Sequence, residues 1–385
     1  MANSIATRWR DLSGENSWKD LLSPVDSDLR RYIIHYGERA GAAGDLFNDT
    51  LASRGYRFCL CPPDELFSRA GLENGNPFKY QVTNYFYGAA DSDQANWFGY
   101  VAVATDEGKT ALGRRDILVS WRGTGTIPEW IDDARFFLTS AKELLGTDIN
   151  AQVHSGFLAI YTGTIPTSPY SRTSAADQVL KAVQKLVDMY QNEELSITVV
   201  GHSLGAALAT LNATDIVAKG CNKPTGNPNK EFMVTAFVYA SPRVGDQGFK
   251  EAIEGLSNLH ILRLTNFSDV FPMLPPTAVG YTDVGVNLGI NSTKSPYLKP
   301  LINAHNLEVH LHGVAGVQEN GEFKLEIDRD ISLINKKIDG LQDKYKIPPQ
   351  WWNHEMFKNM VQKDDGRWEF VDSAYVPDPP LDYIE

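Results

Sequence analysis

The segment ITVVGHSLGAALATLNA, residues 197–213, constrains the fold of this chain more than any other stretch. Its first four residues are apolar or β-branched and predict a short buried strand. The residues that follow favour a helix, and those at the spacing of one buried helical face are Leu204, Ala207, Leu208 and Leu211. Glycines on both sides of Ser203 permit a sharp turn between strand and helix. This context predicts that the Ser203 hydroxyl is held out at the end of a sheet as a nucleophile.

The rest of the chain alternates apolar strand-like segments with helical ones. The strand-like segments are WFGYVAVATDE, DILVSWRGTGT, ELSITVVGHS, FMVTAFVYASPRVG and LHILRLTNFSDVFP, and SAADQVLKAVQKLVDMYQ has a helical pattern. This alternation predicts an α/β fold with a mostly parallel central sheet and helices on both faces. We expect a single domain over residues 1–385. Within it we expect an amino-terminal helical cap (1–95), a catalytic core (96–316) and a carboxy-terminal extension packed on the core (317–385).

Charge and composition exclude several classes of function. The 36 basic and 48 acidic residues give a net charge of −12, which argues against nucleic acid and against general attraction to anionic membranes. No run of about 18 apolar residues predicts a transmembrane helix, and residues 1–18 lack the apolar core of a secretory signal peptide. The three cysteines fit neither a metal site nor a disulfide framework and suit a reducing compartment. We therefore predict a cytoplasmic protein without a metal.

A nucleophilic serine needs a base, and the base needs a carboxylate that orients it. In the α/β-hydrolase arrangement the acid follows the serine in the chain and the histidine comes last. Asp269 lies four residues beyond the apparent strand end at Thr265, in a loop fixed by prolines. Asp246 also follows a strand, whereas Asp215 is on the same helix as the serine. Because loops after the carboxyl ends of strands face the ligand, we predict Asp269 as the acid.

The chain has only eight histidines, so the base can be sought by elimination. Four of them follow the predicted acid: His305, His310, His312 and His354. If residues 306–316 form a helix, His310 lies beside its buried stripe, and His305 lies at its start, in a loop that can reach Ser203. We predict His305 as the base and keep His312 as the alternative. His202 adjoins the serine but points away from it on the turn.

An oxyanion hole needs two preorganised N–H donors. The amide of Leu204, directly after the nucleophile, is expected to supply one. Thr124, between two glycines after the strand-like segment DILVSW, is expected to supply the second through its amide, with its hydroxyl as a further donor.

Seven motifs together carry a resemblance to a known family: VSWRGTGT, VHSGFLAIY, GHSLGAALA, YASPRVGD, TNFSDVFPMLPP, HNLEVHLHGVAG and IPPQWW. In these motifs the chain resembles the class 3 lipases, and more closely their plant phospholipase A1 class II branch. The resemblance implies an α/β-hydrolase with Ser203 as nucleophile, Asp269 as acid and His305 as base. It also implies Thr124 and Leu204 at the oxyanion hole. His154, in the VHSGF motif, looks structural.

The family resemblance further implies a lid after the oxyanion loop, and the segment IPEWIDDARFF stands at that place. Its Ile127, Trp130 and Ile131 suit an element that opens against a lipid surface. The alternative is that Trp130 packs on the core. Residue 1 begins almost directly on the domain, without the transit segment of plastid members, which also favours the cytosol.

The sequence therefore predicts a serine acylhydrolase that works without a cofactor on lipid at a membrane or micelle surface. By resemblance the substrate is a glycerolipid, and we expect a phospholipid cleaved at the sn-1 position. Within the enzyme class the alternative is a lipase for neutral acylglycerols or galactolipids. From another class, the alternative is a lipase-like signalling scaffold without catalysis. The oligomeric state is left open.

Overall fold

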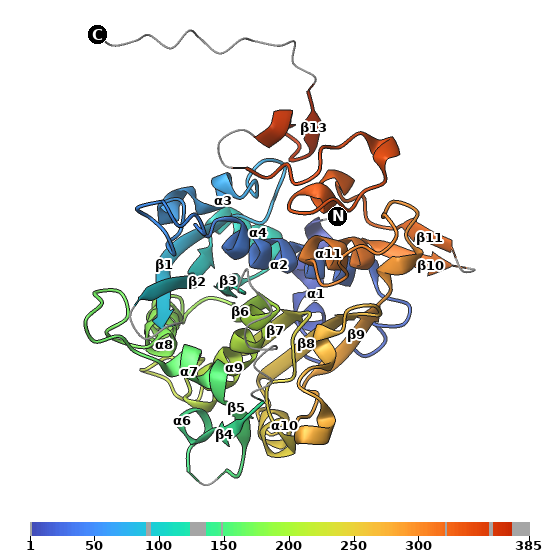
Figure 1. The fold of residues 1–385 in the computed structure, drawn as a ribbon. Coiled ribbons are helices and arrows are strands. Elements are labelled where there is room, and N and C mark those ends of the chain that lie inside the picture. The colour runs from blue at the N-terminus through green and yellow to red at the C-terminus, as the bar shows by residue number, and fades with distance from the viewer. Residues whose placement is uncertain are drawn as a thin grey trace, which may run out of the picture.

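The computed structural model of the chain is built around one large twisted sheet (Figure 1). It describes residues 2–89, 94–123, 136–147, 149–319, 322–353 and 357–371. Over these residues, seven strands pair in the order β1-β2-β3-β6-β7-β8-β9. Their bounds are β1 Tyr80–Ala89, β2 Ala95–Ala104, β3 Arg115–Trp121, β6 Leu195–His202, β7 Met233–Tyr239, β8 Leu259–Asn266 and β9 Val286–Ile290. Strands β3 and β6 to β9 run parallel, and β1 and β2 add antiparallel pairings at one edge. The predicted mostly parallel sheet is confirmed.

Helices cover both faces of the sheet. One face carries α7 (Ser155–Thr162), α8 (Ala175–Met189), α9 (Leu204–Ala218) and α10 (Gln247–Glu254), and the other carries α1 (Ala2–Leu12), α2 (Ser27–Asp45) and α11 (Leu307–Ala315). Strand β6 explains the arrangement, because Ile197 and Val199 pack toward α8 and α9 while Val200 packs toward α2. A strand buried on both faces has a continuous apolar sequence, as residues 197–200 do.

The amino-terminal region 1–95 contains helices, including the short α3 (Leu66–Arg69), but it is not helical throughout. Residues 80–89 form β1, which pairs antiparallel with β2. Tyr80, Val82 and Phe86 of this strand are buried, whereas Gln81 and Thr83 are exposed. The expectation of a helical cap is wrong for residues 80–89. Apolar and polar residues alternate in this stretch, so it forms the edge strand of the sheet instead of a helix.

Short elements connect the main ones. They are η1 (Pro63–Glu65), α4 (Asp106–Leu112), β4 (Leu138–Ser140), α6 (Lys142–Leu145), β5 (Gln152–His154), η2 (Phe271–Met273), η3 (Thr277–Val279) and η4 (Ser292–Lys294). Among the described residues, no helix combines the length and apolar character needed to cross a bilayer.

The carboxy-terminal segment wraps over α2 and α11. Its elements are β10 (Gly316–Glu319), β11 (Glu322–Leu325), η5 (Ile331–Asn335), η6 (Asp343–Tyr345), η7 (Phe357–Asn359), β12 (Met360–Gln362) and β13 (Trp368–Phe370). Arg329 forms ion pairs with Glu38 of α2 and Glu308 of α11, and Lys336 forms one with Asp45 at the end of α2. The fully buried Trp351 donates its indole N–H to the Ser332 carbonyl at 2.8 Å. The ion pairs attach the segment to α2 and α11.

Candidate active site

Ser203 occupies a strained turn between β6 and α9. Its φ of 59° and ψ of −125° lie in a region that residues with a side chain rarely adopt. The amide of Ser203 donates to the Tyr239 carbonyl of β7 at 2.9 Å, which ties the turn to the neighbouring strand. A Cβ on Gly201 would lie 2.1 Å from the Gly205 oxygen, and one on Gly205 would lie 2.3 Å from the Trp121 oxygen. Both glycines are therefore required by close backbone contacts around the serine.

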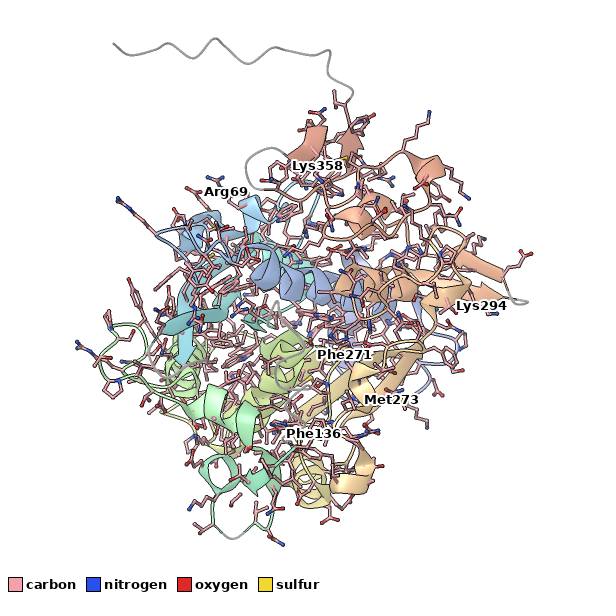
Figure 2. The ribbon with its side chains drawn as sticks, in the orientation of Figure 1. Arg69, Phe136, Phe271, Met273, Lys294 and Lys358 are labelled. Carbon is pink, nitrogen blue, oxygen red and sulfur yellow. The ribbon has the colours of Figure 1, made fainter. Side chains whose placement is uncertain are left out.

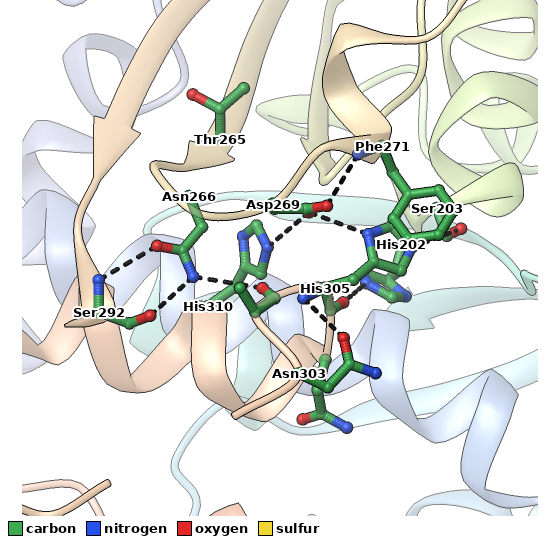
Figure 3. A network of polar contacts seen from close by, with 12 residues as sticks. His202, Ser203, Thr265, Asn266, Asp269, Phe271, Ser292, Asn303, His305 and His310 are labelled. Atoms are coloured by element: carbon green, nitrogen blue, oxygen red, sulfur yellow. Dashed lines mark hydrogen bonds and ion pairs between the residues drawn. The ribbon is translucent and has the colours of Figure 1, made fainter. Parts of the chain in front are cut away.

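The structure brings Ser203, His305 and Asp269 into one hydrogen-bonded chain (Figure 3). The His305 Nε2 and the Ser203 Oγ are 2.9 Å apart, and the His305 Nδ1 lies 2.9 Å from the Asp269 Oδ2. All three residues are buried. Because a carboxylate only accepts, Nδ1 carries the proton, and Nε2 is left to accept the proton of the serine hydroxyl. This is the geometry of an activated nucleophile.

Asp269 is held as a carboxylate by three donors. The Phe271 amide donates to Oδ1 at 3.0 Å, and both His305 and His310 donate to Oδ2. Burial raises the pKa of Asp269, but the hydrogen bonds from His305 and His310 outweigh this effect, so its pKa lies below the ordinary value. The carboxylate therefore stays ionised beside the histidine that it orients.

His310 is a site residue that the sequence analysis did not assign. It is fully buried in the first turns of α11, and its Nε2 lies 3.2 Å from the Asp269 Oδ2. Burial keeps the pKa of His310 below its ordinary value despite the nearby carboxylate, so it donates as a neutral ring. The available signal was its position beside the apolar stripe of the helix, which predicts burial but not the partner.

We expect His310→Leu to lower kcat roughly tenfold, because one hydrogen bond to a charged group is lost while two others still hold Asp269. His310→Gln, which restores an N–H donor, should recover part of this loss, with KM for a soluble ester unchanged in both variants. Steady-state kinetics on p-nitrophenyl butyrate measure the difference. Equal kcat values for His310→Leu and the unmodified protein would show that His310 does not position the carboxylate.

His202 supports the loop of the catalytic histidine rather than the serine. Its Nε2 donates to the His305 carbonyl at 2.7 Å, and the two rings lie 4.9 Å apart. Burial and the neighbouring His305 and His310 keep the pKa of His202 well below its ordinary value. Because the neutral His202 ring donates its N–H to this carbonyl, it holds the backbone of His305 in place.

Two asparagines complete the support of this loop (Figure 3). Asn303 Oδ1 accepts the His305 amide at 3.1 Å. Asn266, the last residue of β8, donates to the Ser292 hydroxyl at 2.8 Å and to the Ala304 carbonyl at 3.2 Å. Side chains from β8 and from the loop before α11 therefore set the position of the His305 ring.

The other acid and base candidates have different partners in the structure. His312 bonds to the Ser295 hydroxyl at 2.7 Å and stacks on Phe323, and burial lowers its pKa to about 3. Asp246 caps α10 by accepting the Phe249 amide. His154 caps α7 through Nδ1. His354 lies outside the described residues.

The oxyanion side of the site is described in part. Leu204 is the first residue of α9, where amides have no acceptor within the helix. A Cβ on Gly123, just after β3, would lie 3.7 Å from the Ser203 Cβ, so the loop after β3 starts beside the nucleophile. Thr124 and the predicted lid residues Ile127, Trp130 and Ile131 lie outside the described residues.

Comparison with known proteins decides the family. The chain is 44% identical over 410 residues to phospholipase A1-IIgamma of Arabidopsis thaliana, covering 100% of this chain and 97% of that protein. It belongs to the class 3 lipase family. Residues 118–279 match the description Lipase (class 3), a range that includes Ser203 and Asp269 but ends before His305.

Two further known proteins are similar to this class 3 lipase. Phospholipase A1-II 4 of Oryza sativa subsp. japonica is 45% identical, with 96% of each chain covered. The solved triacylglyceride lipase of Rhizomucor miehei is 20% identical over 69% of this chain and 82% of that chain, with a TM-score of 0.48. The predicted family and its plant phospholipase A1 branch are confirmed.

Proposed function

We propose that this class 3 lipase is a serine hydrolase that releases fatty acids from glycerolipids, and that its substrates are phospholipids cleaved at the sn-1 position. The observation that carries the proposal is the continuous chain from Ser203 Oγ through His305 to the ionised Asp269, with both links at 2.9 Å. The names of its relatives in Arabidopsis thaliana and Oryza sativa support the choice of phospholipid.

The reaction follows from the positions of the protons. His305 Nε2 takes the proton of Ser203 as Oγ attacks the ester carbonyl, and Asp269 stabilises the imidazolium that forms. The amides at the start of α9 and in the loop after β3, with Leu204 and Thr124 as the proposed donors, bind the oxyanion. His305 then gives its proton to the leaving alcohol. In the second half it activates the water that splits the acyl-serine.

Cleavage at the sn-1 position can be tested directly. The protein is incubated with phosphatidylcholine that carries different acyl chains at the two glycerol positions, and the released acid is identified by mass spectrometry. Release of the sn-1 acid supports a phospholipase A1. If no acid is released from phosphatidylcholine while parallel incubations with neutral acylglycerols or galactolipids release it, the proposed substrate is wrong but the protein is still a serine hydrolase.

The loop that carries Asp269 also exposes large apolar side chains. Phe267, Val270 and Met273 have 81%, 61% and 63% of their surface exposed, and Figure 2 labels Met273 on this loop. Apolar groups gathered beside an active site suit contact with a lipid surface. Because the chain has a net charge of −12, an apolar contact rather than a charged one fits its composition.

We expect the double variant Phe267→Ser and Met273→Ser to bind phosphatidylcholine vesicles at least about tenfold more weakly, because each side chain would bury apolar surface in the lipid. Co-sedimentation with vesicles measures the binding. Met189→Ser, which alters a 58% exposed residue at the end of α8, is the matched control and should bind normally. Unchanged binding of the double variant would remove this loop from the lipid contact.

A further inference from the structure

A cavity of about 830 Å³ connects the catalytic histidine with the carboxy-terminal segment. Gly123, His202 and His305 line it on the catalytic side, and Lys336, Lys337 and Lys358 line it from the carboxy-terminal segment. Figure 2 shows Lys358 on that segment, and it also labels Phe271, whose ring packs 4.1 Å from that of His305. The volume is within the range of small-molecule sites.

The charges around this cavity are unusual for so acidic a chain. Its described lining has four cationic residues, Arg122, Lys336, Lys337 and Lys358, and three carboxylates, Asp45, Asp49 and Glu308. Glu308 is already ion-paired with Arg329, which is not part of the lining. Asp45 alone is shared by two of the lysines, Lys336 and Lys337. Positive charge is therefore left over beside the catalytic histidine.

The lysines differ in how firmly they are held. Lys336 is buried, paired with Asp45 and positioned 4.0 Å from the centre of the Trp352 ring. Lys337 lies 3.2 Å from Asp45 and donates to the Gly44 carbonyl at 2.9 Å, and with 45% of its side chain exposed it keeps one of its three donors for a new anion. Lys358 is exposed, and its ammonium donates to the Pro349 carbonyl at 2.8 Å, which uses one of its three donors.

Arg122 adds a buried cation where the cavity meets the loop after β3. Its guanidinium donates to two neutral acceptors, the carbonyls of Trp97 at 2.9 Å and Gly123 at 2.6 Å. Burial lowers the pKa of Arg122 to about 9, and the charge of Asp49 opposes this shift. The guanidinium also lies 3.7 Å from the centre of the Phe47 ring. A buried cation held by carbonyls and an aromatic ring is stabilised by an anion placed in the same cavity.

We propose that this cavity binds the phosphodiester of a glycerophospholipid headgroup, with Lys337 and Lys358 as its direct contacts, while the scissile ester lies at Ser203. This inference rests on the proposed function. It attributes the preference for phospholipid over neutral acylglycerol to the carboxy-terminal segment. Lys336, Lys337 and Lys358 lie outside residues 118–279, the part of the chain that matches the family description.

The test compares two soluble substrates that differ in the phosphate. The double variant Lys337→Gln and Lys358→Gln should raise KM for dibutyryl phosphatidylcholine roughly three- to tenfold, as expected for the loss of partly exposed ion pairs. KM for dibutyrylglycerol should stay the same. Lys344→Gln removes one charge from the same segment outside the cavity lining, and it should change neither value. Circular dichroism shows whether each variant is folded.

The absence of phospholipid hydrolysis would refute the proposed function but not the headgroup site. A binding measurement therefore tests the headgroup site separately. Calorimetry on Ser203→Ala should detect glycerophosphocholine, with weaker binding once both lysines are replaced by glutamine. Inorganic phosphate, titrated in the same way, separates a headgroup site from a site for free phosphate: tighter binding of phosphate than of glycerophosphocholine would overturn the assignment. Equal effects of the double variant on both esters, or none on either, would also overturn it.

Discussion

Ser203→Ala is expected to lower kcat by about 10⁶-fold, because removal of the nucleophile of a hydrogen-bonded triad eliminates the covalent route. Ser203 Oγ is the only atom of the triad that is poised to attack an ester, 2.9 Å from the base that takes its proton. Hydrolysis of p-nitrophenyl butyrate measures the loss. KM should change little, since the serine hydroxyl contributes mainly to the transition state.

The same substitution should leave the fold intact. Alanine meets the same backbone strain at φ 59° as serine does, so the melting temperature of Ser203→Ala should stay close to that of the unmodified protein. Ser203→Gly is the matched control, because glycine relieves the strain and should melt about 2–4 °C higher than the alanine variant. Turnover retained in both variants would exclude Ser203 as the nucleophile.

His305→Ala should reduce kcat on the same ester by about 10⁵- to 10⁶-fold, since members of such a triad act as a unit. The His305 ring is the only group that bridges the Ser203 hydroxyl and the Asp269 carboxylate in the described site. Without it the hydroxyl keeps its ordinary, weak nucleophilicity.

His312→Ala separates catalysis from stability. His312 is equally buried but bonds to Ser295, so its loss should lower the free energy of unfolding by about 1–3 kcal/mol and keep kcat within twofold. Urea denaturation followed by fluorescence, together with kinetics, distinguishes the two histidines. If His305→Ala kept its rate and His312→Ala lost it, the base would be His312.

Local sequence pattern was enough to predict the turn at Ser203. The apolar run before GHSLG became β6, and the leucines and alanines after it became α9, because both elements are buried among neighbouring layers. Strand β1 was missed because its residues alternate at a sheet edge within a region rich in helical signals. An edge strand is defined by its partner, here β2, and that pairing is not visible locally.

The residues of the site likewise fall into those that the sequence predicts and those that only the folded chain reveals. Chain order and loop position were enough to place Asp269 and His305 as partners of the serine, and the structure sets all three within hydrogen-bonding reach. The role of His310 depends on the register of α11 against β8, which brings a helical ring to a loop carboxylate. The lysines of the cavity come from a segment 133 to 155 residues beyond the serine, so only the folded chain places them in one cavity with His305.

The role of Ser203 as the nucleophile is tested most directly by reaction of the intact protein with a fluorophosphonate, followed by peptide mass spectrometry. We expect one stoichiometric adduct on Ser203, no adduct in Ser203→Ala, and release of fatty acid from phosphatidylcholine by the protein before but not after treatment. A folded protein that is not labelled at Ser203 and releases no acyl chain from phospholipid or p-nitrophenyl butyrate would contradict this role and favour a lipase-like scaffold.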